Sequence, residues 1–144
     1  MVAKVKPSQN LPDLSISTDK VCFVIFKARE FDAKDVVTEP DPGSNPTDDG
    51  MLSVLEDHAD DPVAVELAQF IHAMSEDEKA DLVTMLWIGR GDGGLDDWDD
   101  LRAEAIRLHS KRTALYLIRQ PLLGELLEET LAMLGRSCEE FSPP

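Results

Sequence analysis

Residues 61–89, DPVAVELAQFIHAMSEDEKADLVTMLWIG, contain two helix starts, each followed by a helical pattern. Asp61 followed by Pro62 is typical of the first residues of a helix. Ser75 and Glu78 have the spacing of a capping box, which predicts the start of a second helix. The first helix has an apolar stripe of period 3.6, formed by Val63, Leu67, Phe70, Ile71 and Met74.

The second of these helices is apolar on nearly every side toward its end, in VTMLWI (residues 83–88). A helix that is apolar all round at one end enters a hydrophobic core there. This stretch therefore predicts two consecutive helices, the second of which runs into the centre of the domain.

On the N-terminal side, residues 18–32 predict a buried helix with Thr18 as its N-cap, although VCFVIF alone favours a strand. Residues 1–16 are expected to form a flexible arm. Residues 36–50 hold three prolines and two glycines, which predicts one long Pro/Gly-rich loop. Residues 51–57 predict a short helix.

On the C-terminal side, the pattern predicts one long helix from about 96 to 119 and a last helix that opens at Pro121 and is capped by Gly135. The chain is thus expected to be all-α. It should form a single compact, bundle-like domain of five or six helices over residues 17–136, with a C-terminal tail over 137–144.

The net charge of −15 is concentrated in residues 35–100, which carry nineteen acidic and two basic residues. This field repels phosphate, so nucleic-acid binding is unlikely, and an acidic surface could instead bind a protein or a cation. We find no apolar run of membrane-spanning length and no signal peptide, so we expect a cytoplasmic protein without a membrane segment. In that compartment Cys22 is expected to be a buried free thiol rather than part of a disulfide with Cys138.

Residues 87–100, WIGRGDGGLDDWDD, fit several motifs. The Gly89-x-Gly91-x-x-Gly94 spacing is that of a dinucleotide loop, but a helix precedes it where a strand is required. The aspartates do not fit the register of an EF-hand, although an irregular cation site among them stays open. The Arg90-Gly91-Asp92 tripeptide could act as a cell-adhesion motif only on an exported protein, which we do not expect here. The interpretation that explains most residues is a break between two helices, with aspartates at the positive end of the second.

The basic positions after this break could form a nucleic-acid surface, but we expect them to pair with acidic residues of the same chain. They are Arg102, Arg107, Lys111, Arg112 and Arg119, accompanied by His109.

No Ser/His/Asp, Cys/His or metal-ligand pattern is present, so no catalytic residues, metal or cofactor are assigned. If a binding site exists, we place it between the 36–50 loop and the 87–92 turn. Here Arg90 would hold an anionic group and carboxylates would act in acid–base or metal chemistry. The candidate binding residues are Glu39, Asp41, Asn45, Asp48, Asp49, Trp87, Arg90 and Asp92.

Three stretches together resemble a known family: VCFVIFKAREFDAKDVVTEPDPGSNPTDDG (21–50), LWIGRGD (86–92) and PLLGELLEE (121–129). They are similar to a small family of acidic bacterial proteins catalogued as a domain of unknown function. The resemblance covers about residues 18–141. It implies a single soluble domain and brings no catalytic or binding residues.

Two hypotheses about function follow. The first is a non-catalytic, acidic α-helical interaction module that binds a protein partner or itself. The second is an enzyme, or a protein that binds a small ligand or a metal, with its site at the two loops named above.

Overall fold

The computed structural model describes residues 11–34 and 61–142. The helices are α1 (Thr18–Lys34), α3 (Pro62–His72), α4 (Glu76–Arg90), α5 (Trp98–Arg107), α6 (Thr113–Ile118) and α7 (Leu123–Met133), with a 3₁₀ turn η2 (Leu95–Asp97) before α5. Within these ranges there is no strand, so the all-α prediction is confirmed. The predicted short helix 51–57 and the Pro/Gly-rich loop 36–50 lie outside the described residues.

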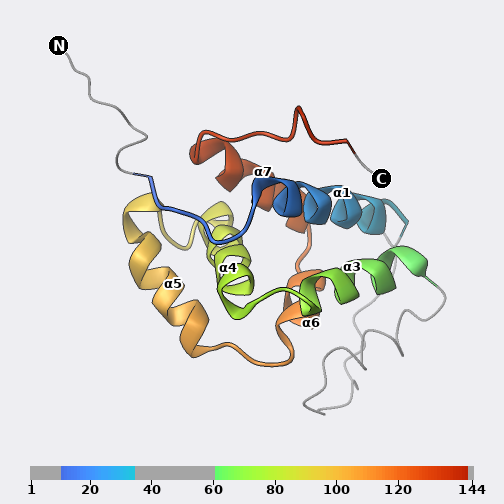
Figure 1. Cartoon of the computed structure of the whole chain (residues 1–144), viewed down its shortest axis with the longest axis horizontal. Coiled ribbons are helices and arrows are strands. Elements are labelled where there is room, and N and C mark those ends of the chain that lie inside the picture. Colours follow the sequence, from blue (N-terminus) through green and yellow to red (C-terminus); the bar gives the residue numbers. More distant parts are fainter. Residues whose placement is uncertain (1–10, 35–60, 143–144) are drawn as a thin grey trace.

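Helix α4 is central (Figure 1). It packs against α7 on one side and against α5 on another. Helix α7 also packs against α1, and α3 packs against both α1 and α6. The side chains of Leu82, Met85 and Leu86 are completely buried, as the apolar end of this helix predicted. Its capping box is present: Ser75 Oγ accepts from the Glu78 N–H at 3.1 Å, and the Glu78 carboxylate accepts from the Ser75 N–H at 2.9 Å.

Gly89 near the end of α4 and Gly91 directly after it are required for different structural reasons. A Cβ on Gly89 would collide with the backbone carbonyl of Leu126, so this glycine lets α4 approach α7 closely. Gly91 caps α4 in the left-handed conformation, with φ +93°, which glycine adopts without strain. The interpretation of this stretch as a helix break is therefore confirmed.

The predicted long helix 96–119 is wrong, because the chain leaves the helix after Arg107 and starts α6 at Thr113. Ser110 makes the local hydrogen bonds of a turn: its hydroxyl accepts from the Arg112 N–H, and its carbonyl accepts from the Thr113 hydroxyl, both at 3.1 Å. Such side-chain bonds compete with the helical pattern. The predicted N-cap of α1 is shifted by one residue, since Ser17 Oγ, and not Thr18, accepts from the Lys20 N–H.

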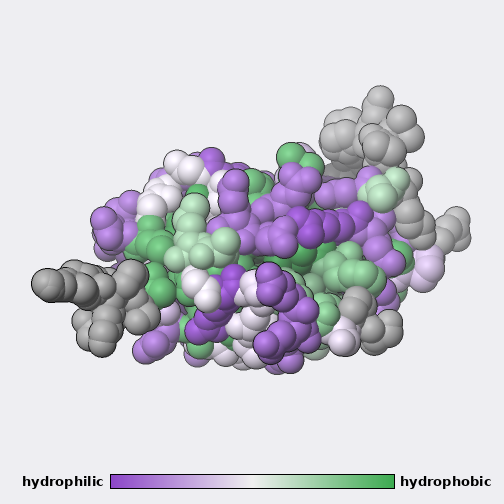
Figure 2. Space-filling view, turned by 90° about the horizontal axis from the view of Figure 1, so that it is seen from above, coloured by the Kyte–Doolittle hydropathy of each residue, from purple (hydrophilic) through white to green (hydrophobic). Residues whose placement is uncertain are grey.

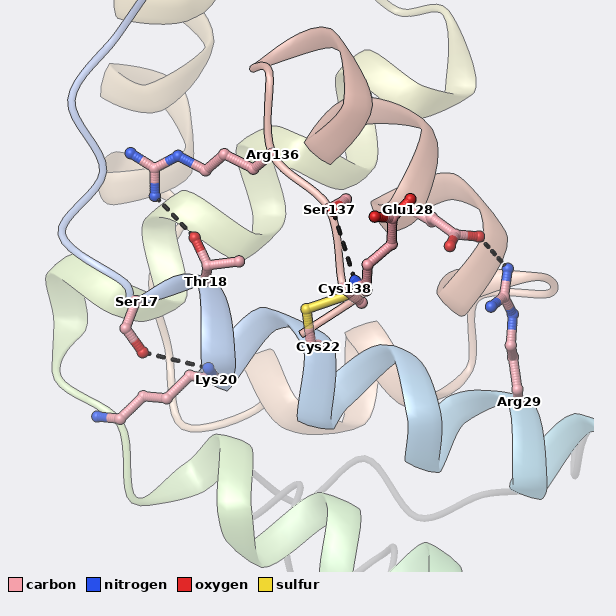
Figure 3. Close-up of a disulfide and its surroundings, with 10 residues drawn as sticks. Ser17, Thr18, Lys20, Cys22, Arg29, Glu128, Arg136, Ser137 and Cys138 are labelled. Carbon is pink, nitrogen blue, oxygen red and sulfur yellow. Dashed lines mark hydrogen bonds and ion pairs between the residues drawn. A yellow bond between two sulfur atoms is a disulfide. The ribbon is translucent and has the colours of Figure 1, made fainter. Parts of the chain in front are cut away.

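A disulfide joins Cys22 in α1 to Cys138 after α7, so the expectation of a free thiol at Cys22 is wrong in this structure (Figure 3). Residues 136–138 lie against the start of α1, where Arg136 also donates to the Thr18 hydroxyl at 3.0 Å. Oxidising compartments preserve such a bond, and a cytoplasmic location stays a prediction.

The surface on the side of α1 and α7 is largely hydrophilic. Viewed from the top of Figure 1, hydrophilic side chains run across the middle of this face and hydrophobic surface shows between and beside them (Figure 2). Ion pairs join neighbouring helices: Arg29 of α1 pairs with Glu128 of α7, and Lys27 of α1 pairs with Glu66 of α3 at 2.9 Å. The Arg29–Glu128 pair is exposed, so it contributes little to stability.

Candidate functional site

The C-terminal end of α4 meets α6 at a cluster of polar side chains around Arg90. Arg90 Nε and Nη2 donate to Asp92 Oδ2 at 3.0 and 2.6 Å. Its Nη1 donates to Gln120 Oε1 at 3.0 Å and, more weakly, to Tyr116 Oη at 3.4 Å. The Asp92 carboxylate, as the main cause, raises the pKa of Arg90, so the guanidinium stays charged in the cluster.

Helical spacing brings these side chains together. Trp87 lies one turn before Arg90 on α4, and its indole Nε1 donates to Tyr116 Oη at 2.9 Å. Tyr116 and Gln120 lie four residues apart along α6 and the residues that follow it, so both face α4. The result is a network in which Tyr116 Oη accepts hydrogen bonds from Trp87 and from Arg90.

Three of the candidate residues predicted from the sequence are thus neighbours in space: Trp87, Arg90 and Asp92. The other five, Glu39, Asp41, Asn45, Asp48 and Asp49, lie outside the described residues. Their placement opposite the turn therefore stays a prediction.

The predicted set lacks Tyr116 and Gln120, which belong to the same cluster. Their one signal in the sequence is a polar pair at helical spacing, and that signal does not say which helix they face. The cluster also accounts for RGD: Arg90 and Asp92 pair across the left-handed Gly91 and close the end of α4.

The most buried carboxylate of the described chain, Asp81 of α4, is used by the fold. It accepts from the backbone N–H groups of Ser15 and Ile16, the latter at 3.1 Å, and from Arg102 Nε of α5 at 2.7 Å. Asp81 therefore fixes residues 15 and 16, which the sequence assigned to the arm, and holds α5 against α4. Since its hydrogen bonds are all to the protein, we do not assign it to a ligand site.

The outer face of α5 has opposite charges at its two ends. Asp99 and Asp100 are exposed in the first turn and Arg107 in the last, with the small Ala103 exposed between them. Ile106 also lies on this side and is 46% exposed. Asp99 and Asp100 make no ion pair with the other described residues, and Arg107 pairs within its own helix with Glu104. No other described helix covers this face, because α5 lies at one edge of the molecule (Figure 1).

The basic residues within α5 and directly after it behave in two ways. Arg102 pairs with Asp81 and Asp77, and Arg107 with Glu104, which confirms the expected pairing within the chain for these two. Lys111 and Arg112, by contrast, make no ion pair with the residues that the structure describes.

Among residues 11–34 and 61–142, no group of three or more His, Cys, Asp and Glu side chains is placed to hold a metal ion. No helix in these ranges is both long enough and apolar enough to cross a membrane.

The fold and the surface thus define an all-α domain with a polar cluster between α4 and α6 and an uncovered, charge-polarised helix at its edge. The chain belongs to a family of proteins of unknown function, DUF3775, whose model matches residues 64–136. The match covers most of α3 and all of α4 to α7, including two of the three stretches that carry the resemblance noted in the sequence. Comparison with curated proteins and with solved structures found no match.

Proposed function

We propose that this protein is a non-catalytic interaction module that pairs with a second copy of itself through the outer face of α5. The observation that carries the proposal is the order of side chains along this face: acidic at the start, small in the middle and basic at the end. A helix with this order is complementary to itself when a second copy runs in the opposite direction.

Helix geometry supports such a pairing. Asp100, Ala103 and Arg107 are spaced i, i+3 and i+7, so they lie along one stripe of α5. In an antiparallel pair with its two-fold axis near Ala103, Asp100 of each copy faces Arg107 of the other. The small side chain of Ala103 lets the two helices approach closely. The same symmetry brings the two Ile106 side chains to the same side of the helix pair, where they are removed from water.

The strength of the contact should be modest. One helix pair buries less area than a standard stable interface, which places it among the weak and transient contacts. We therefore expect a Kd on the order of 10⁻⁵–10⁻⁴ M. The Arg107–Glu104 pair must be exchanged for a pair with Asp100 of the second copy, which costs little because exposed ion pairs are weak.

The second hypothesis, an enzyme or a metal-binding protein at the two loops, has less support. The hydrogen bonds of Arg90 go to Asp92, Tyr116 and Gln120. The carboxylates required from the 36–50 loop lie outside the described residues. We also retain the view that nucleic acid is not the partner, because the net charge of −15 opposes it.

Sedimentation equilibrium of the full-length, oxidised protein from about 10 µM to 1 mM tests the proposal, since this range brackets the expected Kd. We expect the average mass to rise from monomer to dimer. Ala103→Arg places a large charged side chain at the centre of the contact and should leave the protein monomeric. Ala132→Arg makes the same change at an exposed position of α7 and should dimerise like the wild type. A wild type that stays monomeric at 1 mM, or an Ala103→Arg variant that still dimerises, would overturn the proposal.

A further inference from the structure

A pocket of about 430 Å³ lies on α6 and is lined by Arg112, Leu115, Tyr116, Arg119 and Gln120. These residues are spaced i, i+3, i+4, i+7 and i+8, so they lie along one side of α6 and of the residues directly before and after it. The volume falls within the range of small-molecule sites in proteins. Leu115 and the ring of Tyr116 provide apolar walls, and the other side chains are polar.

The hydrogen bonds that Tyr116 Oη accepts leave its own hydrogen to donate to a further group. A phenolic oxygen has two acceptor positions and one hydrogen. Trp87 Nε1 and Arg90 Nη1 can only donate, and both donate to this oxygen. The Tyr116 O–H must therefore donate elsewhere, and no acceptor for it is found within residues 11–34 and 61–142.

The same reasoning applies to Gln120. Its Oε1 accepts from Arg90 Nη1 at 3.0 Å, which fixes the orientation of the amide, since arginine cannot accept. The amide nitrogen then carries two hydrogens that have no acceptor in the described part of the chain.

Arg112 adds a charge to these donors. Its side chain is half-buried, and its guanidinium makes no hydrogen bond or ion pair with other described residues. Arg119 lies on the pocket wall as well. The segment from residue 105 to residue 124 contains no Asp or Glu, although the chain has 29 acidic residues. The five lining residues therefore supply donors and include no carboxylate.

We infer that this pocket binds a small organic carboxylate whose apolar body lies against Leu115 and the Tyr116 ring. The carboxylate accepts hydrogen bonds from the Arg112 guanidinium, the Tyr116 hydroxyl and the Gln120 amide. A planar carboxylate matches the paired donors of arginine. A phosphate could use the same donors, but its second charge would be opposed more strongly by the acidic molecule around it. The inference does not depend on α5 pairing.

The test uses the full-length oxidised protein and a matched series of probes: 2-naphthoate, the neutral 2-naphthamide and 2-naphthyl phosphate. Nitrogen-15 NMR follows the indole N–H of Trp87, which bonds to Tyr116 and so reports on the pocket. We expect 2-naphthoate to shift this signal saturably in the millimolar range or below, and the amide to bind at least about tenfold more weakly, because charge-assisted bonds are the strong ones.

Two conservative variants connect the binding to the pocket. Arg112→Gln keeps much of the side-chain length and removes the charge, and Tyr116→Phe keeps the ring and removes the hydroxyl. Each should weaken 2-naphthoate binding about tenfold, since each removes a hydrogen bond to a charged group. Lys111→Gln removes the same charge from the adjacent residue, which does not line the pocket, and should bind like the wild type. If Arg112→Gln does not fold, the 2-naphthoate binding of Tyr116→Phe still tests whether the ligand binds in this pocket.

Any one of four results would overturn the inference. These are no saturable shift with 2-naphthoate, equal binding of 2-naphthamide and 2-naphthoate, tighter binding of 2-naphthyl phosphate than of 2-naphthoate, or unchanged 2-naphthoate binding by Arg112→Gln and Tyr116→Phe.

Discussion

Asp81 of α4 is fully buried and accepts a hydrogen bond from Arg102 of α5 at 2.7 Å. The same guanidinium also pairs with Asp77, whose side chain is 68% exposed. One arginine thus makes a buried and an exposed ion pair, and the two pairs should differ greatly in their effect on stability.

Asp81→Ala should lower the free energy of unfolding by about 3–5 kcal/mol, because it leaves a partly buried arginine without its main partner and frees two backbone N–H groups. Asp77→Ala should lower it by less than about 1 kcal/mol, as expected of an exposed pair. Urea unfolding followed by circular dichroism measures both. Similar losses for the two variants would show that Asp81 does not hold α5 as described.

The disulfide closes a loop across 116 positions of sequence, so it should stabilise the fold strongly. In the chain-entropy description, a loop of this size contributes roughly 3–5 kcal/mol through the unfolded state. We expect dithiothreitol to lower the urea midpoint of the wild type substantially and to leave a Cys22→Ala/Cys138→Ala variant unchanged. If reduction leaves the wild-type midpoint in place, the bond is not a main constraint on the fold.

Gly89 and Gly94 should respond differently to the same substitution. A methyl group at Gly89 meets the Leu126 backbone, whereas nothing lies within 4 Å of a Cβ at Gly94. Although alanine favours a helix, Gly89→Ala should cost about 1–3 kcal/mol through overpacking of α4 against α7. Gly94→Ala should stay within about 0.5 kcal/mol of the wild type. Thermal or urea unfolding measures the stability of both variants. An unchanged or increased stability of Gly89→Ala would contradict the close approach of α4 and α7.

Glu78 should make stability depend on pH in the acid range. Its hydrogen bond from Lys20, at 2.7 Å, and a second from the Ser75 N–H lower its pKa below the ordinary value of 4.5. A carboxylate with a lowered folded-state pKa stabilises the protein above its unfolded-state pKa. It loses that contribution as pH falls through the folded-state pKa.

Glu78→Gln should therefore be less stable than the wild type at pH 7. We expect a difference of only about 0.5–1 kcal/mol, since Lys20 is partly exposed and solvent screens the pair. The difference should shrink below pH 4.5. Urea unfolding from pH 7 to pH 3 measures it, with Glu129→Gln on the exposed side of α7 as the matched neutralisation. A difference that stays constant over this range would rule out the ionised carboxylate as its cause.

The sequence predicted well those features that depend on neighbouring residues. The Ser75–Glu78 capping box, the Asp61 cap and the helix break at the glycines after Ile88 are each specified within one helical turn, and the structure contains all three. The break between α5 and α6 was missed because Leu108 and Leu115 fit one continuous apolar stripe. The bonds of Ser110 that interrupt the helix leave no trace in that pattern.

Features that depend on distant residues could not be predicted in the same way. Trp87 and Arg90 were expected at a site, but Tyr116 is 26 positions beyond Arg90 and reaches it through the packing of α6 on the rest of the fold. A disulfide between Cys22 and Cys138 was not expected, because the sequence indicated a reducing compartment. The packing of the C-terminal tail on α1 nevertheless brings the two cysteines together. The polarity of α5 became visible once the structure showed which of its faces is exposed.

A charge exchange shows whether α5 pairs with its own copy in the antiparallel direction. Asp100→Arg and Arg107→Asp, made separately, each place like charges opposite one another in the pair and should prevent dimer formation. The two substitutions together restore opposite charges across the two-fold axis and should recover the dimer. Arg136→Asp, a charge reversal away from α5, should not alter it.

Sedimentation equilibrium of these four variants beside the wild type is the measurement. We expect monomers for the two single α5 variants and dimers for the wild type, the double variant and Arg136→Asp. A double variant that remains monomeric while folded, or single variants that dimerise like the wild type, would show that α5 does not pair in this way.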